Sequence, residues 1–354
     1  MKKIQTMLTV LVVCSAALWP LACGKNISPT STGATPTATP TLTPNSLAGF
    51  DWGAALANNV SPGSTQFSQR YSHTSVVYNN AMWVIGGESS LGVFDNDVWS
   101  STDGVNWTPV LGNNPPGTTQ FSPRSDHTSV VFNNAMWVIG GDATGAYSPD
   151  LWSSTNGSTW TQAAPGAHFS GRYDHTSLVY NGAMWVIGGI SSGGFLNDVW
   201  SSPDGVNWTN VLTNNSAPGT NQFSQRDILT SLVFNNTMWV IGGWNGSTYF
   251  GDVWYSTNGL NWYEATASAP FGGRIGMTSF VYNGAMWVTG GYNGSVYLND
   301  VWYSTNGVNW TEANAGAAFT KSAFSTGLVY NNAMWIIGGQ VPSGLLNSVW
   351  TSPY

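Results

Sequence analysis

The chain has 354 residues, of which only nine are Lys or Arg and sixteen are Asp or Glu, so 7% are charged. Average soluble domains have roughly 25%. This scarcity argues against a coiled coil, a helical bundle and a charged disordered protein, which all need Glu, Lys and Arg in quantity. A net charge of −7 also excludes a protein that binds nucleic acid through basic surface. Twenty Trp and 42 Gly residues favour a β protein.

Residues 1–22 have the pattern of a secretory signal peptide. Lys2 and Lys3 precede an apolar stretch that runs from Met7 to Leu18. The sequence from Leu21 to Gly24 resembles the lipobox of bacterial lipoproteins, which implies that Cys23 is lipidated. A cleaved signal with an incidental Cys is the alternative. We expect an exported protein that only a lipid anchor holds on the bacterial cell envelope, at the outer membrane or cell surface.

Residues 23–48 predict a Thr- and Pro-rich linker between the anchor and a folded domain. Alternating Thr and Pro residues cannot bury apolar surface, so an extended, solvated segment is expected. Both cysteines, Cys14 and Cys23, precede residues 49–354. The domain therefore has no thiol for a disulfide or a cysteine metal site, and we expect neither a metal nor a cofactor.

Six internal repeats fill residues 49–354. Met-Trp-Val-Ile-Gly-Gly begins at Met82 and recurs, with small variations, every 48 or 54 residues up to Met334. Each repeat predicts four short strands, in the first repeat at 73–78, 81–85, 98–101 and 105–108. Asn79-Asn80 and Asp103-Gly104 suit the tight turns between them. Four antiparallel strands every 50 residues or so are typical of a β-propeller blade.

The sixth repeat ends without a fourth strand, but a matching segment precedes the first repeat. Gly49-Phe50-Asp51-Trp52 matches Gly104-Val105-Asn106-Trp107. We predict that this N-terminal strand becomes the outer strand of the last blade and so removes an exposed edge. The prediction is an all-β, six-bladed ring over residues 49–354, which we expect to be monomeric.

The repeats are similar to kelch repeats, a class that includes the galactose oxidase central domain. The resemblance rests on Arg70-x-x-His73, the strand that ends in Gly86-Gly87, Asn96-Asp97-Val98-Trp99 and the late Trp107. It implies a six-bladed propeller, and it does not decide the function, because kelch rings serve as enzymes and as binding platforms. The copper-radical chemistry of galactose oxidase needs a Tyr–Cys cross-link, which a domain without Cys cannot form.

Charged residues follow the repeat in two registers. Every Arg of the chain precedes the Gly-Gly pair of its repeat by the same interval, and an Asp precedes the third-strand Trp. The sixth repeat lacks both. This joint loss predicts five structural ion pairs: Arg70–Asp97, Arg124–Asp150, Arg172–Asp198, Arg226–Asp252 and Arg274–Asp300. An arginine ring that clamps an anionic ligand is the alternative.

The loops between the second and third strands and between repeats share one face, and they vary most. Trp244 is the only Trp of residues 49–354 outside the repeated positions. Aromatic and acidic side chains on a rigid rim suit a carbohydrate or a protein loop. The candidate binding residues are Glu88, Asp142, Trp244, Tyr292, Tyr147, Tyr249 and Tyr297. Loop aromatics that merely cover the strands beneath them are the alternative.

His73, His127 and His175 share one register in three consecutive repeats, and Asp126 and Asp174 precede two of them. The blades separate these histidines too far for a three-His metal site. The kelch resemblance implies a structural role for His at this register.

The favoured function is a non-catalytic, surface-displayed lipoprotein whose propeller binds a glycan or protein partner and no nucleic acid. Two alternatives stay open: a carbohydrate-active enzyme of the sialic-acid mutarotase or sialidase type, and a structural module of the envelope. We assign no catalytic residue. The sequence does not identify the ligand.

Overall fold

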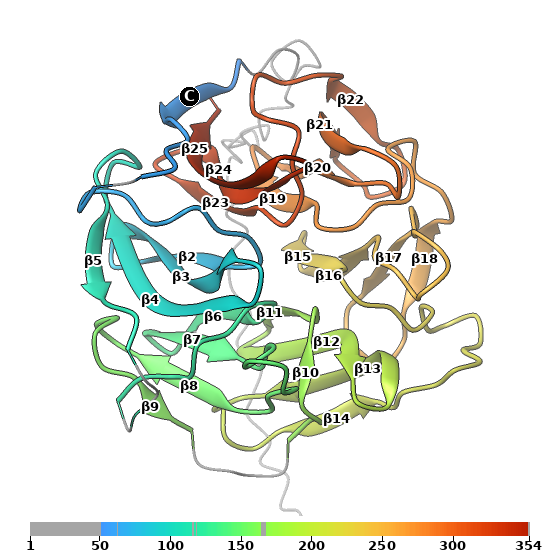
Figure 1. Cartoon of the computed structure of the whole chain (residues 1–354). Helices are drawn as coiled ribbons and strands as arrows, with labels where there is room; N and C mark the ends of the chain where they lie inside the picture. Colours follow the sequence, from blue (N-terminus) through green and yellow to red (C-terminus); the bar gives the residue numbers. More distant parts are fainter. Residues whose placement is uncertain (1–50, 62, 115–116, 118, 164–167, 353–354) are drawn as a thin grey trace, which may run out of the picture. The chain divides into compact units, whose positions relative to one another are not determined.

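The computed structural model describes residues 51–352, except 62, 115–116, 118 and 164–167. These residues form six antiparallel sheets around one central axis (Figure 1). Within the described ranges there is no helix long and apolar enough to cross a membrane. The signal peptide and linker predicted at residues 1–48 lie outside the described residues. The predicted all-β, six-bladed fold is confirmed.

Each sheet is one blade, with its first strand nearest the axis and its fourth outermost. The first strands are β2 (Thr74–Tyr78), β6 (Thr128–Phe132), β11 (Thr176–Tyr180), β15 (Thr230–Phe234), β19 (Thr278–Tyr282) and β23 (Thr326–Tyr330). The second strands are β3 (Ala81–Ser90), β7 (Ala135–Ile139), β12 (Ala183–Ser191), β16 (Thr237–Ile241), β20 (Ala285–Tyr292) and β24 (Ala333–Val341).

The outer half of each blade follows the same order. The third strands are β4 (Val93–Ser101), β8 (Leu151–Ser154), β13 (Gly194–Ser202), β17 (Val253–Ser256), β21 (Tyr297–Ser304) and β25 (Gly344–Thr351). The fourth strands are β5 (Thr108–Leu111), β9 (Thr161–Gln162), β14 (Thr209–Leu212), β18 (Tyr263–Thr266), β22 (Thr311–Asn314) and β1 (Gly53–Leu56). Blade three has a fifth short strand, β10 (Arg172–Tyr173), which pairs with the end of β12.

The ring is closed by the first strand of the chain, as the sequence predicts. Strand β1 pairs antiparallel with β25, and the first strands of blades one and six, β2 and β23, contact each other across the same seam. The closing strand is Gly53–Leu56, however, and not the four residues that end at Trp52. In blade one the outer strand likewise begins at Thr108 and not at Val105.

The late start of the outer strands has a local cause. Ser101 Oγ accepts a hydrogen bond from the Gly104 N–H at 2.8 Å, and Asp103 Oδ1 accepts from the N–H groups of Val105 and Asn106 at 2.8 Å. These side chains use the amides that a strand ladder would need, so residues 102–107 form a turn. The prediction of a two-residue connection between the third and fourth strands is therefore wrong. The connection between the first two strands has two residues, and Asn79 and Asn80 both have positive φ, as a tight hairpin requires.

The core lies between the blades. Six clusters of buried residues each combine strands of two neighbouring blades. In the cluster between blades six and one, Phe67 packs edge-to-face on Trp107 with ring centroids 5.1 Å apart. In the cluster between blades five and six, Trp52 packs the same way on Phe319 at 5.2 Å. Packing is tight: a Cβ on Gly157 would lie 2.3 Å from Cζ3 of Trp83. The repeated Trp residues therefore hold blades together and offer no stacking surface.

Main-chain hydrogen bonds join every blade to the next around the axis. The second Gly of each Gly-Gly pair donates its N–H to the carbonyl of the Arg-register residue in the next blade, at 2.9–3.3 Å. Gly339 closes this cycle by donating to Arg70 O at 2.9 Å. We call these six bonds the glycine belt. Gly87 has a φ of +104°, and a Cβ there would lie 2.6 Å from His73 Cβ, so only glycine fits.

A second set of bonds lies beside the belt, at the residue two positions after each Arg and, in blade six, two positions after Ser322. We call these six positions the neck residues: Ser72, Asp126, Asp174, Ile228, Gly276 and Phe324. All six have φ between 48° and 58°. Five donate their N–H to the neck carbonyl of the preceding blade at 2.8–3.2 Å, and among the described residues only the step from Gly276 to Ile228 lacks this bond.

Candidate functional site

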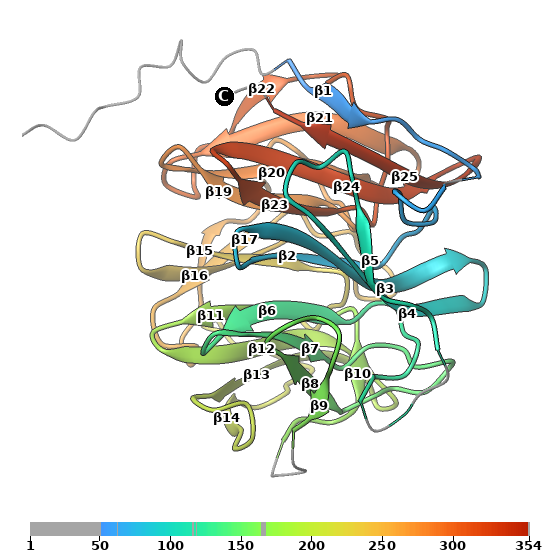
Figure 2. The same ribbon diagram turned by 90° about the vertical axis from the view of Figure 1, so that its left-hand side faces the viewer.

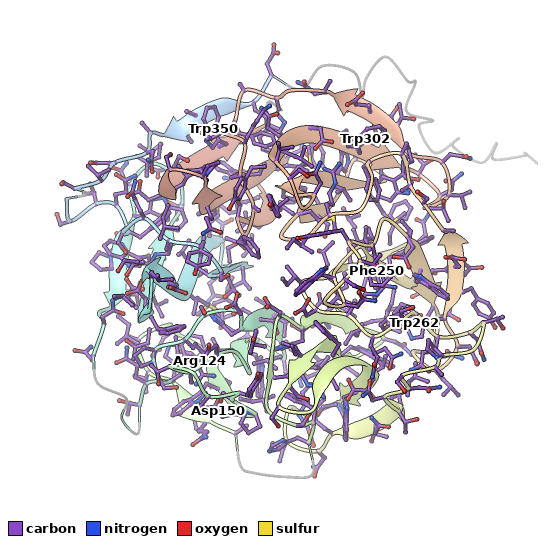
Figure 3. All side chains as sticks on the ribbon, turned by 45° about the vertical axis from the view of Figure 1, so that its right-hand side comes forward. Arg124, Asp150, Phe250, Trp262, Trp302 and Trp350 are labelled. Carbon is purple, nitrogen blue, oxygen red and sulfur yellow. The ribbon has the colours of Figure 1, made fainter. Side chains whose placement is uncertain are left out.

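The five Arg–Asp pairs predicted from the sequence lie in contact, at nitrogen–oxygen distances of 2.5–2.7 Å. In blade three, Arg172 donates from Nη1 and Nη2 to the two carboxylate oxygens of Asp198 and also to Gly188 O. The indole N–H of Trp200 donates to Asp198 Oδ2 at 2.8 Å. Figure 3 shows the equivalent Arg124 and Asp150 side by side in blade two. Each pair thus joins the loop before a blade to its Gly-Gly pair and its third strand.

These guanidinium groups are not placed to bind an external anion. All five Arg side chains are at most 2% exposed, and each lies over a Phe ring with 5.2–5.7 Å from Cζ to the ring centroid. In blade six, Ser322 and Ser348 occupy the two registers, and the indole of Trp350 donates to Ser348 Oγ instead. Burial and the bidentate contact of each Arg with its Asp oppose the arginine-ring alternative.

The side chains of His73, His127 and His175 pack between neighbouring blades. Each ring lies against the first Gly of the preceding blade, so that a Cβ on Gly338, Gly86 or Gly140 would lie within 3.0 Å of a ring carbon. The Nε2 atoms of His127 and His175 make hydrogen bonds to Thr74 and Thr128 at 3.1 and 2.9 Å. Burial lowers the pKa of all three imidazoles, which therefore stay neutral at pH 7. No three His, Cys, Asp or Glu side chains of the described part of the chain are grouped to hold a metal ion.

Two of the candidate rim residues stabilise their own hairpins. Glu88 is 6% exposed; its Oε2 accepts from the Tyr71 hydroxyl at 2.7 Å and its Oε1 from the Gly92 N–H at 2.6 Å. Asp142 Oδ1 accepts from the Gly145 N–H at 2.5 Å. Both carboxylates thus cap turns. The β3–β4 and β24–β25 hairpins extend on the same side of the ring (Figure 2), which places these loops on one face.

The aromatic candidates form a continuous row on this face. Trp244 lies 5.8 Å from Phe195 and 6.3 Å from Tyr249, Tyr249 lies 6.2 Å from Tyr292, and Tyr292 lies 5.1 Å from Tyr297, between ring centroids. All five rings are half-buried. We call Phe195, Trp244, Tyr249, Tyr292 and Tyr297 the aromatic row. It spans blades three to five. Tyr147, which is 38% exposed, lies apart from it and stacks on Tyr173 at 5.1 Å.

Trp244 and Tyr292 bring the row close to the axis. Their backbones pair with Asp227 and Ile275, and each of these residues directly precedes a neck residue. The row therefore borders the mouth of the central channel on one side only. Four of its five members are among the candidate binding residues predicted from the sequence, and Phe195 is the addition that the structure makes.

Comparison with protein families agrees with this architecture. Residues 33–224, more than half of the chain, match the family model of the KLHDC2/KLHL20/DRC7 Kelch-repeats domain. The chain belongs to the kelch-repeat family. No curated protein matches the sequence. In this kelch ring the family's Arg, Gly-Gly, Asp and Trp positions are those that join strands and blades, so they account for the fold and leave the rim and neck residues for function.

The channel mouth of this kelch propeller carries the carboxyl groups of Asp126 and Asp174, to which the sequence prediction gave no role of their own. Asp126 and Asp174 are neck residues of adjacent blades, and their carboxyl groups lie close enough for each to affect the pKa of the other. Burial raises the pKa of both, and the charge of Asp126 further raises the pKa of Asp174. The packing of blade two against blade three brings these side chains together, and the spacing of the two residues in the sequence does not show this contact.

Asp227, beside this pair, predicts how stability changes with pH. Burial and then the charge of Asp126 raise its pKa to about 7, while an unfolded Asp titrates near ~3.9. The folded kelch ring holds the proton more tightly than the unfolded chain, so stability decreases as pH rises from about 4 to about 7. Asp227→Asn should be more stable than the wild type at pH 8, by on the order of 1–3 kcal/mol, and equal to it at pH 4.

Urea unfolding at the two pH values measures this difference. Glu264→Gln removes an exposed carboxylate on β18 and should leave the pH dependence unchanged. An Asp227→Asn protein that is no more stable than wild type at pH 8 would contradict the assignment.

Proposed function

We propose that this protein is a non-catalytic binding module, displayed on the cell envelope by a lipid anchor at Cys23, whose kelch propeller recognises a glycan or protein partner. The partner contacts the face that carries the aromatic row and the channel mouth. The kelch fold supports a binding or scaffold role. The anchor and the envelope location rest on the signal-like and lipobox-like residues of the N-terminus.

The aromatic row is the observation that carries the proposal. At the position of Trp244 and Tyr292 the other blades have Glu88, Asp142, Ile190 and Gln340, so these two aromatics are not needed to build a blade. Half-buried rings fixed by their neighbours offer large contact area at a low cost in side-chain entropy. Clustered on loops over a rigid scaffold, such rings are typical of recognition surfaces.

Substitution of the row tests the proposal. The ligand is first identified with residues 46–354 on a glycan array and on purified envelope proteins. Trp244→Ala and Tyr292→Ala should each weaken capture of that ligand by about tenfold or more, because central aromatic anchors dominate binding energy. Affinity is measured by surface plasmon resonance, and unchanged urea unfolding shows that the ring is intact.

Tyr263→Ala provides the matched control. Tyr263 is an aromatic residue, 51% exposed, on the outer strand β18. Its removal should leave affinity unchanged. Full affinity in both row variants, with the control also unchanged, would show that recognition uses another surface.

A further inference from the structure

A cavity of about 160 Å³ lies on the axis at the channel mouth. All six neck residues line it, together with the residues that follow them, so every blade contributes to its wall. Its volume is below the ~300–1,000 Å³ typical of pockets for whole small-molecule ligands. It has room for several water molecules or for one extended side chain.

The two sides of this cavity differ in chemistry. Blades two and three contribute the Asp126 and Asp174 carboxyl groups, whereas blades four to six contribute Ile228, Met277 and Phe324. None of the ion pairs among the described residues includes Asp126 or Asp174. The five arginines beneath the mouth are bound to other carboxylates. The acidic side of the cavity therefore has no cationic partner within the described part of the chain.

A further acceptor on the acidic side has no partner. His175 lines the cavity, is 4% exposed and uses Nε2 for Thr128, while its Nδ1 has no hydrogen-bond partner. The imidazole is neutral at pH 7, so its Nδ1 can accept a hydrogen bond from a ligand in the tautomer that carries the proton on Nε2. Next to the cavity, Asp227 is also 4% exposed and its Oδ1 is unpartnered. Buried polar atoms without a partner are uncommon in native proteins and point to a missing hydrogen-bond partner.

We propose that this cavity receives a primary ammonium group at the end of an aliphatic chain, as a lysine side chain of a protein partner presents it. The ammonium lies against Asp126 and Asp174, and its methylene stem lies against Ile228, Met277 and Phe324. The proposal rests on the proposed binding function and deepens it, because it selects a protein partner and names the group that enters the channel.

Charge and shape both favour this ligand group. An ammonium brings three donors and one positive charge to a site that is lined by two carboxyl groups and by no cationic side chain. Anions are disfavoured by the carboxylates, and a neutral sugar leaves the acidic side without a counter-charge. Lysine also has the unbranched stem that an apolar wall accommodates while the charged end reaches a polar one.

Binding of an ammonium releases protons, which gives the proposal a specific signature. Burial raises the pKa of both carboxyl groups and so favours a proton on the free pair, whereas a cation between the two groups favours the doubly ionised form. Affinity therefore increases from pH 6 to pH 8. The other titratable groups that face the pair are Asp227, Asp142, Glu88, Tyr71, Tyr173, His127 and His175.

Isothermal titration calorimetry of the full chain tests the cavity with a small probe. Nα-acetyl-lysine methylamide should bind with 1:1 stoichiometry, more tightly at pH 8 than at pH 6, and with proton release seen in buffers of different ionisation enthalpy. Nα-acetyl-norleucine methylamide, which has the stem without the ammonium, should not bind. Equal binding of the norleucine probe, equal binding of glucosamine, or no binding of the lysine probe would overturn the proposal.

Asp174→Asn is the decisive variant. Asn tolerates the positive φ of 53° at this position, so the fold should be retained. Its affinity for the lysine probe should fall about tenfold or more, because a charge-assisted hydrogen bond is lost, and proton release should disappear. Glu264→Gln removes the same charge from β18 and should bind normally. Unchanged binding by Asp174→Asn would overturn the proposal.

The same probe separates this proposal from the proposed function. Trp244→Ala should still bind Nα-acetyl-lysine methylamide while it loses the full partner, because the cavity does not include the aromatic row. If substitution of the aromatic row leaves affinity for the full partner unchanged, the rim is not the binding face. If the lysine probe does not bind while substitution of the aromatic row still weakens binding of the full partner, only the ammonium site is contradicted.

Discussion

Arg172→Ser is expected to lower the free energy of unfolding by about 3–5 kcal/mol, the usual cost of leaving one member of a buried ion pair alone. Arg172 is fully buried and Asp198 is 8% exposed, so water cannot replace the lost guanidinium. The substitution also leaves Gly188 O and Ser170 O without their donors. Urea unfolding of the full chain at pH 7 measures the loss.

Blade six supplies the design of the control. It has Ser322 and Ser348 in place of the ion pair and still forms four strands. The double variant Arg172→Ser with Asp198→Ser reproduces this arrangement in blade three. It should recover about 2 kcal/mol or more relative to the sum of the two single variants. Strictly additive losses would show that the two side chains do not act as a pair.

Removal of the closing strand should have a larger effect. A chain that begins at residue 58 lacks β1 and Trp52, which is 3% exposed and belongs to the cluster between blades five and six. Loss of a buried Trp alone costs about 3–5 kcal/mol, and the pairing of β1 with β25 is lost as well. The exposed edge of β25 also becomes a template for pairing between molecules.

Size-exclusion chromatography and urea unfolding check both consequences. The shortened chain should unfold at clearly lower urea concentration and form oligomers, whereas a chain that begins at residue 46 should behave as the full protein. A monomeric shortened chain of full stability would mean that β1 contributes nothing to ring closure.

The sequence predicted the features that repetition makes visible. Six copies of Met-Trp-Val-Ile-Gly-Gly predicted the inner strands. Because the sixth repeat lacks both the Arg and the Asp, the sequence also predicted that Arg172 pairs with Asp198, and the two side chains are in contact. The match of Trp52 to Trp107 located the closing segment, although the strand itself begins one residue later, at Gly53. These predictions succeeded because each compares positions within one chain.

Features that depend on three-dimensional closure could not be predicted in the same way. The carboxyl pair of Asp126 and Asp174 joins residues from different blades, and the cavity needs all six. Glu88 was predicted to bind a ligand because it departs from the repeat, yet it departs to cap its own hairpin. A residue that differs between repeats is not needed for the shared fold. Its hydrogen bonds in the structure then show whether it stabilises its own loop or is available to bind a ligand.

The glycine belt has a consequence for how such a ring changes over generations. Its six bonds use only main-chain atoms, and the bond at blade six persists although that blade has Ser322 instead of Arg. The side chains of the neck residues are therefore not needed for these bonds between blades. The blades otherwise repeat closely, but the neck residues differ: Ser72, Asp126, Asp174, Ile228, Gly276 and Phe324. The side chains at these six positions around the opening can therefore differ from blade to blade while the strands and the glycine belt stay the same, within the limit that their positive φ sets.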